Sequence, residues 1–239
     1  YLKRHSTNAP LDTFTYVHKP GSVTEKPAEC LQLYLQYCGV KDPSWSELKH
    51  FVEFLNIQLK ACENSVFCNE QIVGDVMSGL KTFVVKFMIR MSKDFATSSL
   101  KGEVAMENKE VLNNDEQLQV YEIDRRKRWE QSYHPYLFFN KDGTSITFVG
   151  FNVSRNGDIQ DPNKGNVVIE RRAMTPQLHN GLRHNQVDLL ENYRSWNKGT
   201  MINKIGMVMG LEWSYDPDSS YVLTIDNVIK IMAIHMRFR

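Results

Sequence analysis

The sequence lacks the compact motifs by which many enzymes are recognised. It contains no Gly-x-x-x-x-Gly-Lys-Ser/Thr loop to wrap phosphates, no Gly-x-Gly-x-x-Gly turn, no His-Glu-x-x-His and no Gly-x-Ser-x-Gly. These absences remove the usual signatures of phosphate-loop ATPases, dinucleotide-binding enzymes, zinc proteases and serine hydrolases from the 239 residues. The sequence therefore presents no complete active site.

Long apolar runs and an excess of charge of one sign are also missing. No run approaches the roughly 18 consecutive apolar residues that a membrane span needs, and no amino-terminal apolar segment ends in a small-residue cleavage site. The 29 lysines and arginines nearly balance the 28 carboxylates, so nucleic acid is not an expected partner. The chain opens at Tyr1 and closes on Arg239 straight out of an apparent helix, and we therefore expect a segment of a longer protein.

Cysteine is scarce and confined to the first third of the chain, at Cys30, Cys38, Cys62 and Cys68. Disulfides are possible, but two of these residues lie in apparent helices, and a domain of this size is stable without disulfides. The sequence therefore favours reduced thiols and a cytosolic location. A zinc site fits poorly, because no Cys-x-x-Cys occurs and the nearest histidine, His50, lies within a helix. A nucleophilic pairing of His50 with Cys62 or Cys68 stays open, although nothing in the sequence favours it.

The most clearly marked element is a helix at residues 42–60. Asp42 is expected to cap it with Pro43 at the first helical position, and Ser44 with Glu47 has capping-box spacing as an alternative start. Its buried stripe is predicted to contain Leu48, Phe51, Val52, Leu55 and Leu59, widened by Trp45 and Phe54. The residues predicted to face away from this stripe are Glu47, Lys49, Glu53 and Lys60. Such a face must be covered, so the helix predicts a packed domain.

The first part of the chain is predicted to be helical. Residues 1–28 are interpreted as a connecting segment with a short strand at 13–17, and residues 29–97 as a helical subdomain. One helix runs from Glu29 to a stop at Gly39, and another from Gln71 to Phe95. The apolar face of the latter comprises Val73, Val76, Met77, Leu80, Phe83, Val84, Phe87, Met88 and Met91. Its width favours a helix packed on more than one side, with an amphipathic lipid-binding helix as the alternative.

The middle of the chain changes from helical to alternating periodicity. Residues 98–122 are polar and predict a mobile loop, and the basic cluster at 125–129 is either a neutralised helix turn or a phosphate patch or arginine reaching a neighbouring nucleotide. Residues 123–172 predict a small antiparallel sheet with strands at 136–139, 145–151 and 166–170, the first two joined at Asp142-Gly143. Phe138, Phe148 and Phe151 are expected in its core.

Residues 173–239 are predicted to be helical again. Thr175 before Pro176 marks one start, and Thr224 is expected to cap the last helix, with Asp226 in the first turn where a carboxylate suits the helix dipole. The segment 222–226 also resembles a buried strand ending in a magnesium-orienting aspartate, but a helix cap explains the same residues. Together these elements predict an α+β fold that is mostly helical.

Several longer strings resemble the mysterin family, giant vertebrate proteins that combine a dynein-like AAA+ ATPase core with a RING-type E3 ubiquitin ligase. The strings are CGVKDPSWSEL at 38–48, KDFAT at 93–97, KRWE at 127–130, HPYLFFN at 134–140, LTIDN at 223–227 and MRFR at 236–239. They occur over nearly the whole chain, whereas 98–122 and 153–200 depart from the family pattern.

The resemblance implies a non-catalytic part of the AAA+ core that ends just before a phosphate-binding loop and couples nucleotide state between adjacent modules. Tyr221, Leu223 and Thr224 would then lie at the edge of an adenine pocket. ATP, Mg²⁺ and RING zinc are implied for the parent protein, outside this segment. The implied partners are neighbouring AAA+ modules and the ubiquitin machinery, and the implied location is the cytosol, with lipid droplets as a further site. The alternative function is a partner- or lipid-binding helical module without an ATPase role.

Overall fold

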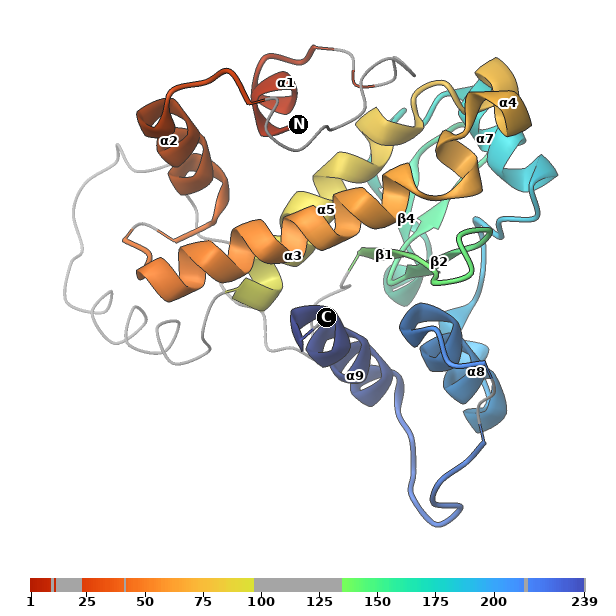
Figure 1. Cartoon of the computed structure of the whole chain (residues 1–239). Helices are drawn as coiled ribbons and strands as arrows, with labels where there is room; N and C mark the ends of the chain where they lie inside the picture. Colours follow the sequence, from red (N-terminus) through yellow and green to blue (C-terminus); the bar gives the residue numbers. More distant parts are fainter. Residues whose placement is uncertain (10, 12–22, 41, 97–134, 213–214, 239) are drawn as a thin grey trace, which may run out of the picture.

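The structure, a computed structural model, describes residues 1–9, 11, 23–40, 42–96, 135–212 and 215–238. Its α-helices are α1 (Leu2–Ser6), α2 (Pro27–Tyr37), α3 (Trp45–Glu63), α4 (Glu70–Val73), α5 (Leu80–Ala96), α7 (Pro176–His184), α8 (Lys198–Met209) and α9 (Ile225–Phe238). Its strands are β1 (Tyr136–Phe139), β2 (Ile146–Val149), β3 (Asn152–Val153), β4 (Ile159–Asp161) and β5 (Val167–Glu170). The predicted mostly helical α+β class is confirmed (Figure 1).

Three sequence predictions concern residues outside the described ranges. They are the strand at 13–17, the mobile loop at 98–122 and the basic cluster at 125–129. Within the predicted connecting segment the structure places α1, a one-turn helix that the sequence did not announce.

Helix α3 begins at the alternative start rather than at Asp42. Ser44 is the N-cap: its Oγ accepts from the Glu47 backbone N–H at 3.3 Å, and its own backbone N–H donates to the Glu47 carboxylate at 2.8 Å. The prediction that Glu47 faces away is therefore wrong, because this reciprocal capping box turns its side chain back against the helix start. Trp45 was wrongly assigned to the buried stripe. It is 78% exposed, since side chains at the first helical position point beyond the helix end.

The stripe itself packs against α5. Leu48, Phe51, Phe54 and Leu55 are buried, and α3 and α5 lie side by side along their lengths (Figure 1). The helix predicted from Gln71 to Phe95 is interrupted, because a 3-10 turn, η2 (Gly74–Met77), separates α4 from α5. Gly74 and Gly79 adopt φ angles of +54° and +91°, which glycine reaches without strain and which end a right-handed helix.

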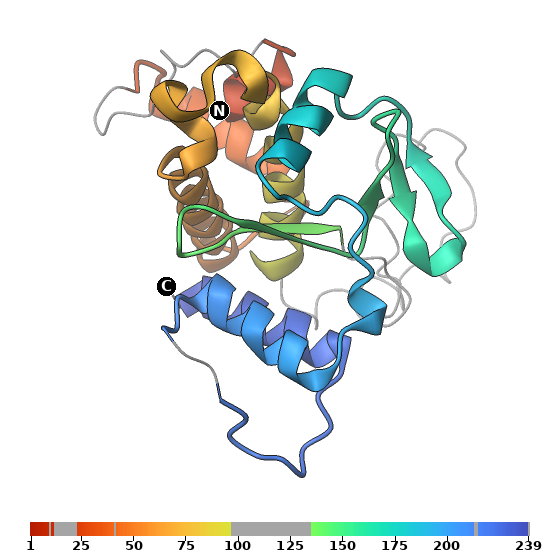
Figure 2. The same ribbon diagram turned by 90° about the vertical axis from the view of Figure 1, so that its right-hand side faces the viewer.

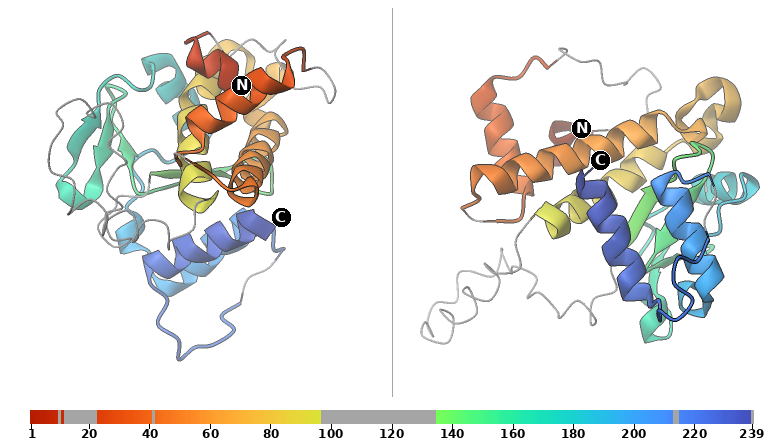
Figure 3. Two further views of the ribbon diagram at one scale, coloured as in Figure 1. Left: turned by 90° about the vertical axis from the view of Figure 1, so that its left-hand side faces the viewer. Right: turned by 60° about the horizontal axis from the view of Figure 1, so that its bottom comes forward.

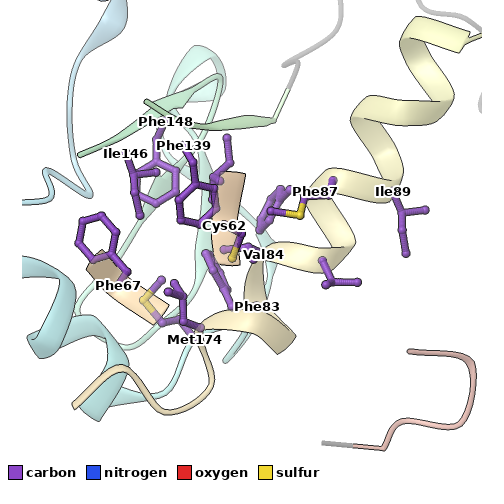
Figure 4. Packing of buried hydrophobic residues seen from close by; sticks show 14 of the residues in the cluster. Cys62, Phe67, Phe83, Val84, Phe87, Ile89, Phe139, Ile146, Phe148 and Met174 are labelled. Atoms are coloured by element: carbon purple, nitrogen blue, oxygen red, sulfur yellow. The ribbon is translucent and has the colours of Figure 1, made fainter. Parts of the chain in front are cut away.

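The β1–β2 hairpin is buried on both faces. The predicted turn is confirmed, with Gly143 at φ +68° and the Asp142 carboxylate accepting backbone N–H groups from Thr144 and Ser145. Side chains alternate along the strands. Leu137, Phe139, Ile146 and Phe148 join the core under α3 and α5, and Tyr136, Phe138 and Val149 join a second core on the other side. Figure 2 shows the hairpin between the two helical layers, and Figure 4 shows Phe67, Phe139, Ile146 and Phe148 packed in the first core.

The predicted single sheet is in fact two sheets. The strand at 166–170 is confirmed as β5, but it pairs with β4, which in turn pairs with β3, and not with the hairpin. The strand predicted to run to Phe151 ends at Val149, because Gly150 at φ +83° redirects the chain into β3. Phe138, Phe148 and Phe151 are all buried, as predicted, and Phe151 stacks on Phe87 with ring centroids 4.7 Å apart.

The carboxy-terminal helices lie on the side of the hairpin opposite to α3 and α5, so that the order of layers is α3 with α5, the hairpin, and α8 with α9. Thr175 caps α7, accepting from the Leu178 N–H at 3.2 Å, and Thr224 caps α9, accepting from the Asn227 N–H at 3.3 Å. Both predicted caps are confirmed. Helices α8 and α9 pack against each other, and α9 also contacts α3 (Figure 3). The second core that holds this layer consists of Phe54, Met91, Tyr136, Phe138, Val149, Tyr193, Trp196, Val208, Val228, Ile229, Met232 and Met236.

Candidate functional site

The three residues predicted at an adenine pocket lie together in the connection that leads into α9. Tyr221 is 50% exposed, Leu223 is half-buried against the second core, and Thr224 is the helix cap. The Tyr221 hydroxyl accepts a hydrogen bond from the Asn227 side chain. Residues 222–224 do not form a strand, so the resemblance of 222–226 to a magnesium-site strand is wrong and the cap explains these residues.

The connection between α8 and α9 is tied to the start of α8. The Lys198 ammonium forms an ion pair with Asp216 at 2.7 Å and donates to the Asp218 backbone carbonyl at 2.7 Å. Asp218 in turn accepts from the Ser220 hydroxyl and backbone N–H, and these hydrogen bonds hold the pKa of its carboxyl below the ordinary value. A cation and two carboxylates therefore define the path of the chain just before Tyr221.

Helix α8 is fixed at its other side by a polar cluster around Glu191. Lys204 pairs with this carboxylate at 2.8 Å, and the Trp196 indole N–H donates to it at 3.0 Å. The Lys204 ammonium also lies over the Trp196 ring, 5.4 Å from its centroid. Trp196 also belongs to the second core, in which α9 packs. The Glu191 cluster therefore connects Lys204 on the surface of α8 to that core.

Helix α9 packs against α8 and α3, and its buried side chains share the second core with Met91 of α5 and with the hairpin. Val228, Ile229 and Met232 are at most 2% exposed, whereas Ile234 on the opposite face of the same helix is 58% exposed. On the hairpin side, the Tyr136 hydroxyl donates to the Asp94 carboxylate at 2.8 Å. Burial and this neighbouring carboxylate raise the pKa of the Tyr136 phenol, so it stays protonated and keeps donating.

The structure brings Cys62 and Cys68 together and leaves His50 apart from them. The two sulfurs are 3.6 Å apart, and all four cysteines are free thiols. His50 and Cys62 are twelve residues apart on α3, which separates their backbones by roughly 18 Å along the helix axis. The open His–Cys pairing is therefore wrong, because a straight helix holds the two residues too far apart.

Among the described residues, no three His, Cys, Asp or Glu side chains gather in a group that could hold a metal ion. The broad apolar face predicted at 73–91 is buried except at Val76, so it is core and offers no surface to lipid. None of the described helices is long and apolar enough to cross a membrane.

His179 on α7 is a buried imidazole whose ionisation is linked to stability. It is 3% exposed, and burial together with the charges of Arg183 and Arg155 lowers the pKa of its ring from the ordinary value of 6.5. As the pH falls, the unfolded chain therefore takes up a proton on this ring at a higher pH than the folded protein does.

We expect the free energy of unfolding to decrease between pH 7 and pH 5, by about 1.4 kcal/mol for each unit of pKa difference. Urea unfolding across this range checks the result. His179→Gln should make the pH profile less steep, and His5, where burial likewise lowers the pKa of the ring, accounts for part of the slope that remains. His184→Gln, at an exposed position of the same helix, is the matched substitution control. An unaltered slope in His179→Gln would show that this imidazole is not the linked group.

The sequence predicted the Thr224 cap of the candidate site, but it did not predict the Lys198 contacts with the α8–α9 connection or the second core. The Lys198–Asp216 pair joins residues that are distant along the chain, and no local pattern signals it. The paired thiols are likewise set by a turn that follows α3. Only the close spacing of Cys62 and Cys68 could have suggested them.

Comparison with known proteins relates the whole chain to very large ubiquitin ligases. No protein-family model matches it. It is 43% identical over 249 residues to E3 ubiquitin-protein ligase RNF213 of Mus musculus. It is 41% identical over 246 residues to E3 ubiquitin-protein ligase rnf213-beta of Danio rerio, and 43% identical over 246 residues to E3 ubiquitin-protein ligase RNF213 of Homo sapiens. Each alignment covers 100% of this chain but only 5% of the relative's length.

Proposed function

Because the chain is homologous along its whole length to one short segment of the mysterin family, the RNF213 ubiquitin ligases, we propose that it works as a non-catalytic part of such a ligase. In this proposal the segment belongs to the AAA+ ATPase core and passes the nucleotide state of one module to the next. ATP, Mg²⁺ and RING zinc act elsewhere in the ligase. The partners are the neighbouring modules and the ubiquitin machinery, and a cytosolic location with lipid-droplet association is part of the proposal.

The proposal is supported by the similarity along the whole of this chain, combined with the layered architecture. A coupling element has to be a stable body that presents a positioned element to its neighbour. Helix α9 fits this role, because one face is locked in the second core while the other, including Ile234, is exposed. The connection that carries Tyr221 is anchored through Lys198, so a displacement there would be transmitted to both α8 and α9.

The alternative, a partner- or lipid-binding helical module without an ATPase role, rested on the apolar face at 73–91. That face forms the core between α3, α5 and the hairpin, and exposing it would require unfolding the first layer. The described contacts therefore favour the coupling role.

The proposal predicts that this chain alone hydrolyses ATP no faster than the buffer does. Hydrolysis that persisted after Asp226→Asn and neutralisation of the basic residues at 125–128 would contradict it.

In the complete ligase, Tyr221→Ala should weaken ATP binding about tenfold through loss of stacking on the base. The matched control is Tyr215→Ala, a tyrosine of the same connection that is 74% exposed. Equal affinities of the two variants would exclude Tyr221 from the adenine pocket.

A further inference from the structure

Cys62 and Cys68 form a close pair at the end of α3. Cys62 lies in the last turn of this helix, and Cys68 ends η1 (Val66–Cys68), with a sulfur–sulfur distance of 3.6 Å. Ser65 shapes the turn between them. Its hydroxyl donates to the Cys62 carbonyl at 2.6 Å, and its carbonyl accepts from the Cys68 N–H at 3.1 Å. Backbone geometry therefore holds the two thiols in contact.

The two thiols differ in exposure and in acidity. Cys62 is 2% exposed, whereas Cys68 is half-buried and reaches the surface. The hydrogen bond from Cys62 lowers the pKa of the Cys68 thiol, with help from the nearby Lys81 charge and the Ser65 hydroxyl. The same hydrogen bond and full burial raise the pKa of the Cys62 thiol. Cys68 is thus the nucleophilic member of the pair and Cys62 the resolving member.

We propose that Cys62 and Cys68 are an oxidant-responsive dithiol that closes to a disulfide when exposed to a peroxide. The Cys68 thiolate attacks one peroxide oxygen, the O–O bond breaks, and a sulfenic acid forms while the released hydroxide takes up a proton to become water. The Cys62 sulfur then attacks the sulfenic sulfur, forming the S–S bond, and the leaving hydroxide carries away the Cys62 proton as a second water. Two thiols and one peroxide give one disulfide and two waters.

The disulfide would lock the junction between the helical layer and the hairpin. Between the two cysteines, the Val66 N–H donates to the Gly143 carbonyl at 2.8 Å. Phe67 packs edge-on against Phe139, with ring centroids 6.5 Å apart. Closing the ring from Cys62 to Cys68 restrains this turn, and with it the tip of the hairpin that separates the two cores.

Peptide mapping of the chain treated with hydrogen peroxide tests this inference. Trypsin leaves Cys62 and Cys68 together in the peptide 61–81, and Cys30 and Cys38 together in the peptide that ends at Lys41. The latter pair is the matched control, since eight residues of helix separate its members by roughly 12 Å. Free thiols are blocked with iodoacetamide in denaturant, disulfides are then reduced, and the released thiols are labelled with N-ethylmaleimide.

We expect at least about tenfold more disulfide in the 61–81 peptide than in the control peptide, because the reacting sulfurs are already in contact. The preference should largely vanish when oxidation is carried out in denaturant. In Cys62→Ala the reaction should stop at Cys68 sulfenic acid, trapped by dimedone, and Cys30→Ala should behave as the unsubstituted chain. Equal disulfide in both peptides of the native chain, or no dimedone adduct on Cys68 in Cys62→Ala, would overturn the inference.

Discussion

Replacing Phe138 with alanine is expected to lower the free energy of unfolding by about 3–5 kcal/mol. Phe138 is 2% exposed and lies on the face of β1 that meets α9, in one cluster with Val228 and Met232. Its removal leaves a cavity in the core shared by the hairpin and the carboxy-terminal helices, and the cost grows with the part of that cavity that the neighbouring side chains do not fill. Equilibrium unfolding in urea, followed by circular dichroism, measures the loss.

The matched control is Trp45→Ala, a larger truncation at a site that is 78% exposed. It should change the free energy of unfolding by no more than about 0.5 kcal/mol. If Phe138→Ala cost as little as Trp45→Ala, the hairpin would not lie between two packed layers.

Gly157→Ala is expected to destabilise the fold by about 2–5 kcal/mol, through backbone strain and a collision together. Gly157 adopts φ +78°, and a Cβ built on it would lie 1.9 Å from the Met174 carbonyl oxygen. That oxygen cannot move away easily, because the Met174 backbone N–H donates to the Gly157 carbonyl at 3.1 Å. Thermal unfolding of the variant gives the size of the effect.

Gly165→Ala separates the strain from the collision. Gly165 has a similar φ of +67°, but nothing lies within 4 Å of the position that its Cβ would take. The expected cost is therefore the strain alone, about 1–2 kcal/mol. Equal losses for the two variants would mean that the β3–β4 turn does not press against Met174.

Local signals in the sequence predicted where helices begin or end and where the hairpin turns. The caps at Thr175 and Thr224, the stop at Gly39 and the Asp142-Gly143 turn depend on neighbouring residues, and all four are where the sequence placed them. Ser44 was also foreseen, as an alternative start of α3. These features are predictable because backbone N–H groups at an element's end need partners close in sequence.

Long-range features were not predictable in the same way. The pairing of β5 with β4 depends on the redirection at Gly150, and the break before α5 depends on glycines that also occur within ordinary helices. Both faces of the hairpin are buried because α8 and α9 cover the face opposite to α3 and α5. This covering depends on the contact between α9 and α3, which are far apart in the sequence. In the candidate site, the sequence predicted Thr224 as a cap, whereas the Lys198–Asp216 ion pair appears only in the folded chain. The same holds for the Cys62–Cys68 contact at the end of α3.

The most direct test of the coupling role compares two substitutions on opposite faces of α9 in the complete ligase. Met232→Ala empties a fully buried position in the second core, and Ile234→Ala shortens a side chain that is 58% exposed. Both variants are first checked for folding, and their ATP turnover is then measured. We predict that both variants reduce ATP turnover at least about fivefold, a factor at the lower end of typical allosteric coupling. Met232→Ala does so because α9 loses its packing in the second core, and Ile234→Ala because it shortens a side chain on the face presented to the neighbouring module. Unchanged turnover in a folded Met232→Ala ligase would contradict the coupling role of this segment.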